Sequence, residues 1–383
     1  MALHFSRDEF ADRVGRLQAR LNEWGLDGAL IFQPESMFYL TGYDTFGFCF
    51  FQCLYVGADG QIMLLTRAPD KRQAAHTSTV GDIRIWIDAA GADPVGQLRR
   101  ELASLPIGGK RLGVEYRASG LNAYYGRQLD AVVGRDFELA DFSEVVDEMR
   151  LVKSAAEMAY VERAAELSDA ALDAAIATTR AGAFEGDILA AMQGAVFQGG
   201  GDYPGNEFVI GSGRDALLCR YFSGRRRLDP VDQLTLEFAG AYRHYHACHM
   251  RTIVVGSVSD RHRALHAAAE EALGACIDAL RPGEPLGAVF DAHARTLDAA
   301  GLSAHRMNAC GYSLGTTFAP VWMDPPMLYT GNPVIAAPNM VFFMHMIIAD
   351  SDREVAMTLG QTVVVTATGS RRLSRHDDRL LTA

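Results

Sequence analysis

The sequence has no long apolar run and no excess of basic residues. Residues Met1 to Phe10 are charged and amphipathic, without the apolar stretch of a secretory signal, and no run reaches the roughly 20 residues that a membrane-spanning helix needs. We therefore expect a cytoplasmic protein that makes no membrane contact. With 36 Lys and Arg against 47 Asp and Glu, the formal net charge is −11. This balance argues against nucleic acid as a partner, because phosphates are bound by basic surfaces.

Cysteine is also scarce. Six cysteines are scattered through 383 residues, a usage that indicates free thiols rather than a disulfide framework. Cys49 and Cys53 lie in an aromatic run with no second cysteine pair to complete a zinc site. We therefore expect both to be buried packing residues.

The length favours two domains, because 383 residues exceed one comfortable core. Helix and strand signals alternate through the first part of the chain, beginning with a predicted helix over Asp8–Trp24 that Gly25 ends. Such alternation is typical of an α/β domain. Ser154 and Glu157 have the spacing of a capping box at the start of a long helix. We therefore predict domains at 1–150 and 151–383.

The second domain is expected to combine helices with an antiparallel sheet. Apolar periodicity and turn residues predict a long helix after Ser154 and further helices over 184–197, 261–280 and 286–300. Runs of apolar and β-branched residues predict strands over 233–240, 245–255, 341–348 and 362–366.

The predicted strand pair from Leu234 to Thr252 concentrates titratable side chains. Glu237 has apolar neighbours and should be substantially buried, and a buried carboxylate without a partner usually marks a functional site. A salt bridge from Glu237 to Arg220 or Arg251 is the structural alternative.

Three histidines lie within one stretch of six residues in this strand pair, 244–249. Strand alternation places His244, His246 and Cys248 on one face and Tyr245 and His249 on the other. A strand end with exposed histidines would explain one such residue, but their density favours a function. We regard His246 as the best catalytic candidate among them.

The same segment resembles the metal-binding strand pair of the aminopeptidase P, prolidase and creatinase superfamily. There, two Asp residues separated by ten others, followed by Xaa-Thr-Arg-Thr, hold part of a pair of divalent ions. Here Glu237 and Cys248 stand at those positions. The motifs Gly-Tyr-Ser-Leu-Gly, Met-Val-Phe-Phe-Met-His and Gly-Gln-Thr-Val-Val-Val-Thr place Tyr312, His345 and Gly360 at the other three.

Only one of these five positions carries a carboxylate, whereas manganese or cobalt prefers several. The resemblance therefore implies an enzyme without a metal or other cofactor. The Glu-Phe-Ala-Gly and Gly-Tyr-Ser-Leu-Gly patterns resemble the metal-free ectoine hydrolase branch more than creatinase. Creatinase has a catalytic His 17 residues before the first ligand position, and Arg220 stands there in this chain.

The resemblance also implies the fold, which is of the α+β class. We expect an N-terminal α/β creatinase-like domain, followed by a pita-bread domain in which an antiparallel sheet carries two pseudo-symmetric helix pairs. It further implies a homodimer, because in creatinase-like dimers an N-terminal loop of one subunit reaches the active site of the other. Tyr43, Asp44 and Phe46 would suit packing against a planar cation there, although a core strand with a turn at Gly42 explains the same run equally well.

These features together predict a metal-independent hydrolase that cleaves a C–N bond in a small zwitterionic amidine or guanidine. Glu237 would be the nucleophile or general base, and His246 and His345 would transfer protons. Arg220 or Arg251 would hold the substrate carboxylate.

Three residues of the predicted site have a second interpretation. Tyr312 would donate a hydrogen bond to the substrate or fill the space left by the metals. His345 lies in an apolar strand, where a satisfied core histidine is equally expected. Cys248 is interpreted as a former ligand position that fills space.

Two other functions remain open at this point. One is an Xaa-Pro dipeptidase in which Glu237, His246 and His345 bind a single zinc ion. The other is a non-catalytic pseudo-peptidase that binds peptides or a partner protein.

Overall fold

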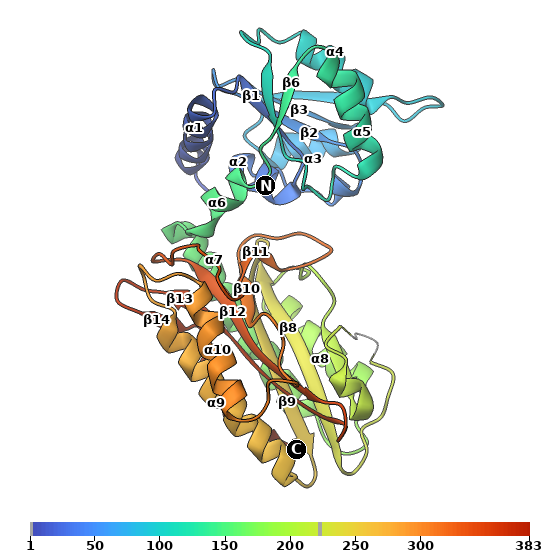
Figure 1. Cartoon of the computed structure of the whole chain (residues 1–383). Helices are drawn as coiled ribbons and strands as arrows, with labels where there is room; N and C mark the ends of the chain where they lie inside the picture. Colours follow the sequence, from blue (N-terminus) through green and yellow to red (C-terminus); the bar gives the residue numbers. More distant parts are fainter. Residues whose placement is uncertain (1–2, 221–223) are drawn as a thin grey trace. The chain divides into compact units, whose positions relative to one another are not determined.

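The chain divides into two units, Met1–Arg150 and Leu151–Ala383, in the computed structural model (Figure 1). The structure describes residues 3–220 and 224–383. Within these residues no helix is long and apolar enough to cross a membrane. All six cysteines are free thiols. Cys53 is buried as expected, but Cys49 is exposed, so the packing role predicted for Cys49 is wrong.

The first unit is a mixed six-stranded sheet with helices on both faces. The strands lie in the order β4-β3-β2-β1-β5-β6, and β1 pairs antiparallel with β2 but parallel with β5. The strands are β1 (Gly28–Ile31), β2 (Cys53–Gly57), β3 (Ile62–Arg67), β4 (Asp82–Trp86), β5 (Arg111–Val114) and β6 (Glu138–Asp141). The helices are α1 (Arg7–Glu23), α2 (Pro34–Thr41), α3 (Asp70–Thr77), α4 (Pro94–Ala103), α5 (Ala123–Val132) and α6 (Val145–Leu151). One apolar core lies between the sheet and α1 to α3, and a second between the sheet and α4 and α5.

The start of the aromatic run is helical rather than a core strand. Helix α2 begins at Pro34, whose fixed φ suits the first turn, and it ends at Gly42, which has a left-handed φ of 81°. Glu115 accepts hydrogen bonds from the N–H groups of Phe32 and Gln33 at 2.9 and 2.6 Å and from the Ser36 hydroxyl at 2.6 Å. It thereby satisfies the backbone donors that lead into α2 and ties the first turn of the helix to the end of β5 through Ser36.

The second unit is built on one large, mainly antiparallel sheet. Its strands follow the order β11-β10-β12-β13-β9-β8-β7, with β14 added to β13 and β15 to β9. The strands are β7 (Val209–Ser212), β8 (Asp232–Tyr242), β9 (Tyr245–Val255), β10 (Gly311–Ser313), β11 (Asp324–Met327), β12 (Val341–Asp350), β13 (Val355–Val365), β14 (Ser370–Arg372) and β15 (Leu381–Thr382). The predicted strands are present, although β13 begins well before the predicted residue 362.

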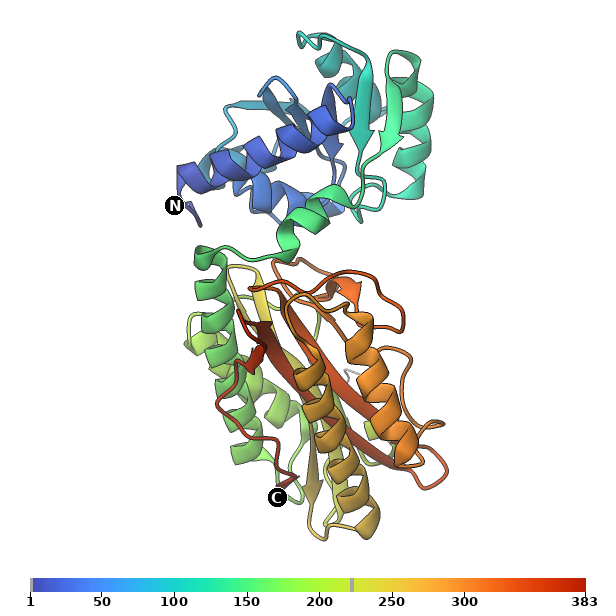
Figure 2. The ribbon, with the colours of Figure 1, turned by 60° about the vertical axis from the view of Figure 1, so that its left-hand side comes forward.

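Two helix pairs pack on the same face of this sheet. They are α7 (Ala155–Thr178) with α8 (Glu185–Gln198), and α9 (Asp260–Ala279) with α10 (Gly287–Ala299). In Figure 2, α9 (gold) and α10 (orange) lie side by side over the strands. Helix α7 starts with the predicted capping box of Ser154 and Glu157. Gly240 of β8 lies against the backbone of α7, where a Cβ would collide with the Ala164 carbonyl oxygen. The other face of the sheet is therefore free to carry a site.

Candidate active site

The register of the sheet aligns one row of residues across four strands. Glu237 of β8 pairs with Met250 of β9, Met250 pairs with Gly360 of β13, and Gly360 pairs with His345 of β12. Side chains that are directly opposite on neighbouring strands point to the same face. Glu237 and His345, which are far apart in sequence, therefore share the face opposite the helix pairs.

Cys248 and Tyr312 face the same way. Cys248 lies two residues from Met250, and Tyr312 pairs with Phe343, which lies two residues from His345. Because strand side chains alternate with a period of two, the positions that the sequence singled out as ligand equivalents all lie on one face.

A cavity of about 320 Å³ opens on this face. Its walls are mostly apolar. They come from the sheet, from the loop between α8 and β7 (199–208), from the loop between β10 and β11 (314–323), and from two further connections, between β7 and β8 and between α10 and β10. The polar groups in the lining include Glu237, Tyr312, His345, Arg220 and Glu207. Apolar walls with a few convergent polar groups are typical of a small-molecule site.

Glu237 is the partly buried acidic group of this cavity. Burial raises the pKa of its carboxyl from 4.5 to about 7, while a hydrogen bond from Tyr312 and the charge of Arg220 act in the opposite direction. A carboxyl with a pKa near 7 is suited to accept and return a proton at neutral pH.

A hydrogen-bond chain orients Glu237. The Trp322 indole N–H donates to the Tyr312 hydroxyl at 2.8 Å, and that hydroxyl donates to Glu237 Oε1 at 3.1 Å. Burial and the nearby Glu237 charge raise the Tyr312 pKa well above its usual value, so Tyr312 remains a hydrogen-bond donor. The second carboxyl oxygen of Glu237 takes no part in this series of hydrogen bonds.

His345 is the second titratable group of the cavity. Burial and the nearby His293 lower its pKa from 6.5 to about 4, so the imidazole is neutral at pH 7. Its side chain is only 8 % exposed, and its Nδ1 has no hydrogen-bond partner among the described residues. An unsatisfied buried nitrogen that lines a cavity is a hydrogen-bonding site for a ligand.

Arg220 and Glu207 give the cavity a charged rim. Both line the cavity, and both are exposed. A guanidinium at this place suits bidentate binding of a carboxylate.

Two family models match the chain in succession. The model described as "Creatinase/Prolidase N-terminal domain" matches residues 13–152, and the model described as "Metallopeptidase family M24" matches residues 159–367. The chain belongs to metallopeptidase family M24. The predicted family and fold, an α/β domain followed by a pita-bread domain, are therefore confirmed.

Known M24 relatives fall into more than one activity class. The chain is 28% identical to "Uncharacterized hydrolase/peptidase y4tM" of Sinorhizobium fredii, over 97% of each chain. It is 23% identical to the ectoine hydrolase of Halomonas elongata, covering 98% of this chain and 97% of the relative. The solved structure of the Xaa-Pro dipeptidase from Bacillus anthracis superposes with a TM-score of 0.85 at 18% identity, covering 98% and 100%. The chain thus resembles both a dipeptidase, in fold, and an ectoine hydrolase, in sequence.

The residues at the M24 ligand positions do not fit a pair of metal ions. No group of three or more His, Cys, Asp or Glu side chains within residues 3–220 and 224–383 is arranged to hold one. Tyr312 uses its hydroxyl to donate to Glu237, and a Cβ on Gly360 would lie 2.7 Å from the Phe343 ring. The ring therefore occupies the space that a carboxylate at position 360 would need.

His246 does not line the cavity, although it is on the cavity face of β9. It is fully buried, and both ring nitrogens have hydrogen-bond partners, Gly205 N–H at Nε2 and the Thr317 hydroxyl at Nδ1. Burial lowers its pKa from 6.5 to about 3. The structure therefore does not bring the predicted proton-transfer residue to the reacting groups.

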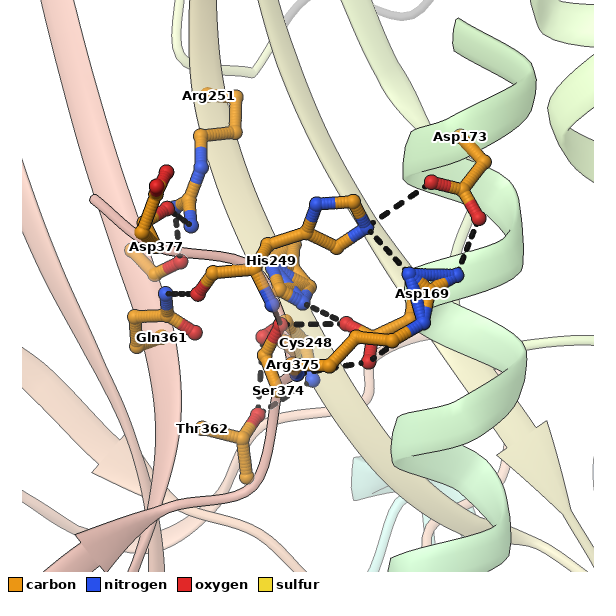
Figure 3. Close-up of polar contacts among 12 residues, drawn as sticks. Asp169, Asp173, Cys248, His249, Arg251, Gln361, Thr362, Ser374, Arg375 and Asp377 are labelled. Atoms are coloured by element: carbon orange, nitrogen blue, oxygen red, sulfur yellow. Dashed lines mark hydrogen bonds and ion pairs between the residues drawn. The ribbon is translucent and has the colours of Figure 1, made fainter. Parts of the chain in front are cut away.

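Arg251 also lies outside the site. Glu237 pairs with Met250, so the side chain of Arg251, the next residue, points to the opposite face of the sheet. It pairs with Leu359 on the helix face of the sheet, where it donates to the Gly360 carbonyl at 2.8 Å and to the Asp377 carbonyl at 3.4 Å. Figure 3 shows this cluster of polar contacts, in which the buried His249 contacts Asp169 of α7. Arg220 is therefore the only one of the two predicted arginines that lines the cavity.

The three residues predicted in the N-terminal loop have different surroundings. Tyr43 is buried, and its hydroxyl hydrogen-bonds to Gln52 and Thr66 at 3.1 Å each, so it belongs to the core of the first unit. Asp44 forms an ion pair with His4 at 3.3 Å. Phe46 is 84% exposed, and it alone among the three presents its ring to a potential partner.

Two further residues that shape the site, Trp322 and Asn206, were not predicted from the sequence. Trp322 is one of only three tryptophans in the chain, and this scarcity was a signal that could have drawn attention to it. Asn206, which accepts from the Trp322 backbone N–H at 3.1 Å, carries no comparable signal, because its partner is distant in sequence.

Proposed function

We propose that this M24 protein is a metal-independent hydrolase of a C–N bond in a small zwitterionic amidine, guanidine or related compound. The observation that carries the proposal is Glu237, a partly buried carboxyl with a pKa raised to about 7 that lines a small, mostly apolar cavity. The 23% identity to an ectoine hydrolase over nearly the full chain supports the same class.

The proposed reaction uses Glu237 twice. Its ionised carboxylate takes a proton from water while the water oxygen bonds to the amidinium or guanidinium carbon, and the C=N π pair moves to nitrogen. The protonated Glu237 then gives that proton to the leaving nitrogen. The C–N bond breaks as the C=O bond forms, the hydroxyl proton passes to the departing amine, and the carboxylate is regenerated. Neutral His345 hydrogen-bonds to the reacting group, and Arg220 binds the substrate carboxylate.

An assay over a substrate panel tests this proposal against an Xaa-Pro dipeptidase, the class suggested by the fold. Ectoine, creatine, related betaines and proline dipeptides would be screened by thermal shift and then by product formation, with and without a chelator. We expect turnover of a non-peptide compound that the chelator does not reduce, and elemental analysis without stoichiometric transition metal. Cleavage of Xaa-Pro dipeptides that is lost with the chelator would support the peptidase instead. Binding without turnover would indicate a pseudo-enzyme.

We also propose that the chain forms a homodimer. The exposed ring of Phe46, on a loop of the first unit, would supply the apolar contact. Sedimentation at micromolar concentration should give a dimer, and Phe46→Ser should weaken it. A monomer for the unmodified protein would contradict this part of the proposal.

A further inference from the structure

We propose that His246 is a positioning residue: it ties together two of the loops that line the cavity, α8–β7 and β10–β11, and thereby sets the hydrogen-bond chain from Trp322 through Tyr312 to Glu237. This inference deepens the proposed function and rests on it for its catalytic consequence. Its structural part can be tested without any substrate.

The first step is the contact of His246 with both loops. Its Nε2 accepts a hydrogen bond from the Gly205 N–H at 2.9 Å, and its Nδ1 lies 3.0 Å from the Thr317 hydroxyl oxygen. Because Nε2 accepts, the ring proton is on Nδ1, and Nδ1–H donates to Thr317. Gly205 belongs to the α8–β7 loop and Thr317 to the β10–β11 loop, so one neutral imidazole bridges them.

The backbone fixes His246 relative to one of these loops. The His246 N–H donates to the Gly315 carbonyl at 3.3 Å, and the Thr317 N–H donates to the His244 carbonyl at 3.0 Å. These bonds hold the β10–β11 loop against the start of β9. The imidazole therefore starts from a fixed point and reaches the other loop through Gly205.

The two loops meet beside His246. A Cβ on Gly205 would lie 2.6 Å from the Val321 carbonyl oxygen and 2.9 Å from the Trp322 nitrogen, so a glycine is required for this approach. The next residue, Asn206, accepts from the Trp322 backbone N–H at 3.1 Å. The position of Trp322 thus depends on the loop that His246 holds.

Trp322 carries the effect to Glu237. Its indole N–H donates to Tyr312, and Tyr312 donates to the carboxyl group of Glu237. If the loops separate, Trp322 moves and the donor to Glu237 loses its orientation. Misplacement of a reacting group by about 1 Å can cost about 10²-fold in rate.

Both ring nitrogens of His246 are already hydrogen-bonded, which distinguishes a positioning role from proton transfer. A proton-transfer residue needs a nitrogen that reaches the substrate or a water next to it. His246 is fully buried, and both of its nitrogens are bonded within the protein. It therefore acts through the loops.

The structural test uses ¹⁹F NMR of the full chain labelled with fluorotryptophan. The three tryptophans give three resonances, and Trp322→Phe identifies the one of interest. We expect His246→Leu to shift or broaden the Trp322 resonance and to leave the other two unchanged. His246→Gln should largely preserve it, because a Gln oxygen reaches the place of Nε2 and can accept from Gly205. Thr317→Val, which keeps His246 but removes one bond, should give a smaller shift.

His249→Gln is the matched control, because His249 is equally buried on β9 but faces the helices. It should leave the Trp322 resonance in place. An unchanged Trp322 resonance in folded His246→Leu would overturn the inference. If His246→Leu does not fold, an unchanged resonance in Thr317→Val has the same meaning.

The kinetic test uses the same variants once a substrate is known. We expect kcat to fall about 10²-fold in His246→Leu but less than about tenfold in His246→Gln. Equal losses in both would identify proton transfer and overturn the positioning role. Failure of the proposed function would appear elsewhere, as activity that survives Glu237→Gln, while the NMR result would stand.

Discussion

Glu115 in the first unit is a buried carboxyl and Glu237 in the second is a partly buried one, and burial raises the pKa of each to about 7. Their partners differ. Glu115 accepts from two backbone N–H groups and a serine hydroxyl near the start of α2, whereas Glu237 accepts from Tyr312 and lines a cavity. A raised pKa alone therefore does not distinguish a structural carboxyl from one that is proposed to be catalytic. The feature that distinguishes Glu237 from Glu115 is unused hydrogen-bonding capacity next to a cavity.

The largest expected difference between the two is in activity. Glu237→Gln keeps the volume but removes the basicity, so the rate should fall about 10²–10⁴-fold while the protein still folds. Glu115→Gln is the control, because its amide oxygen can accept from the same backbone groups, and it should retain the wild-type rate. The measurement is kcat on the substrate identified by the panel. Near-wild-type activity of Glu237→Gln would remove this residue from the mechanism.

The free energy of unfolding should depend more on Glu115 than on Glu237. Glu115→Leu leaves the Phe32 and Gln33 N–H groups buried without an acceptor, at a cost of about 1–3 kcal/mol for each group. Glu237→Leu leaves a tyrosine hydroxyl beside a cavity that water can enter, and it should cost less. Urea unfolding of both variants measures the difference. If Glu237→Leu were the less stable of the two, the distinction drawn from their partners would fail.

The pH dependence of stability isolates the charge on Glu237. Its pKa in the folded protein is above the ordinary value of 4.5, so the folded state binds the proton more tightly than the unfolded state. The stabilisation is fully present below pH 4.5 and is lost as the pH rises through about 7, by about 1.4 kcal/mol for each pH unit between the two pKa values. Glu237→Gln should remove this loss and be the more stable protein at pH 8. Parallel stability curves for the two proteins would contradict the raised pKa.

The smallest expected effect is on the pH–rate profile. If Glu237 is the general base, kcat/KM should rise with pH to a plateau, with a midpoint near 7 in the free enzyme. Tyr312→Phe removes the hydrogen bond that lowers the Glu237 pKa, so the midpoint should move up by about one pH unit or less. Ser36→Ala removes the corresponding donor from Glu115 and should leave the midpoint unchanged. Equal displacements of the midpoint in both variants would indicate a general effect on the fold.

Much of this arrangement was predictable because it depends on local pattern. The capping box at Ser154 and the alternation along β9 follow from neighbouring residues, and the alternation correctly separated Cys248 and His246 from Tyr245 and His249. Helix α2 was missed because its apolar residues resemble a strand, and the Glu115 carboxylate that accepts from the two N–H groups just before it and from the Ser36 hydroxyl lies 79 to 83 residues away.

Short contiguous motifs were enough to establish the family, the order of the elements and the loss of carboxylates at the metal positions. The identity of the side chains that reach the cavity, in contrast, depends on how the sheet and its loops pack. Arg220 reaches the cavity, while the phase of β9 turns Arg251 towards the helices. His246 is tied to Gly205 and Thr317, which are 41 and 71 residues away. The packing of segments that are distant in sequence determines these partners, so they cannot be predicted from a local sequence pattern.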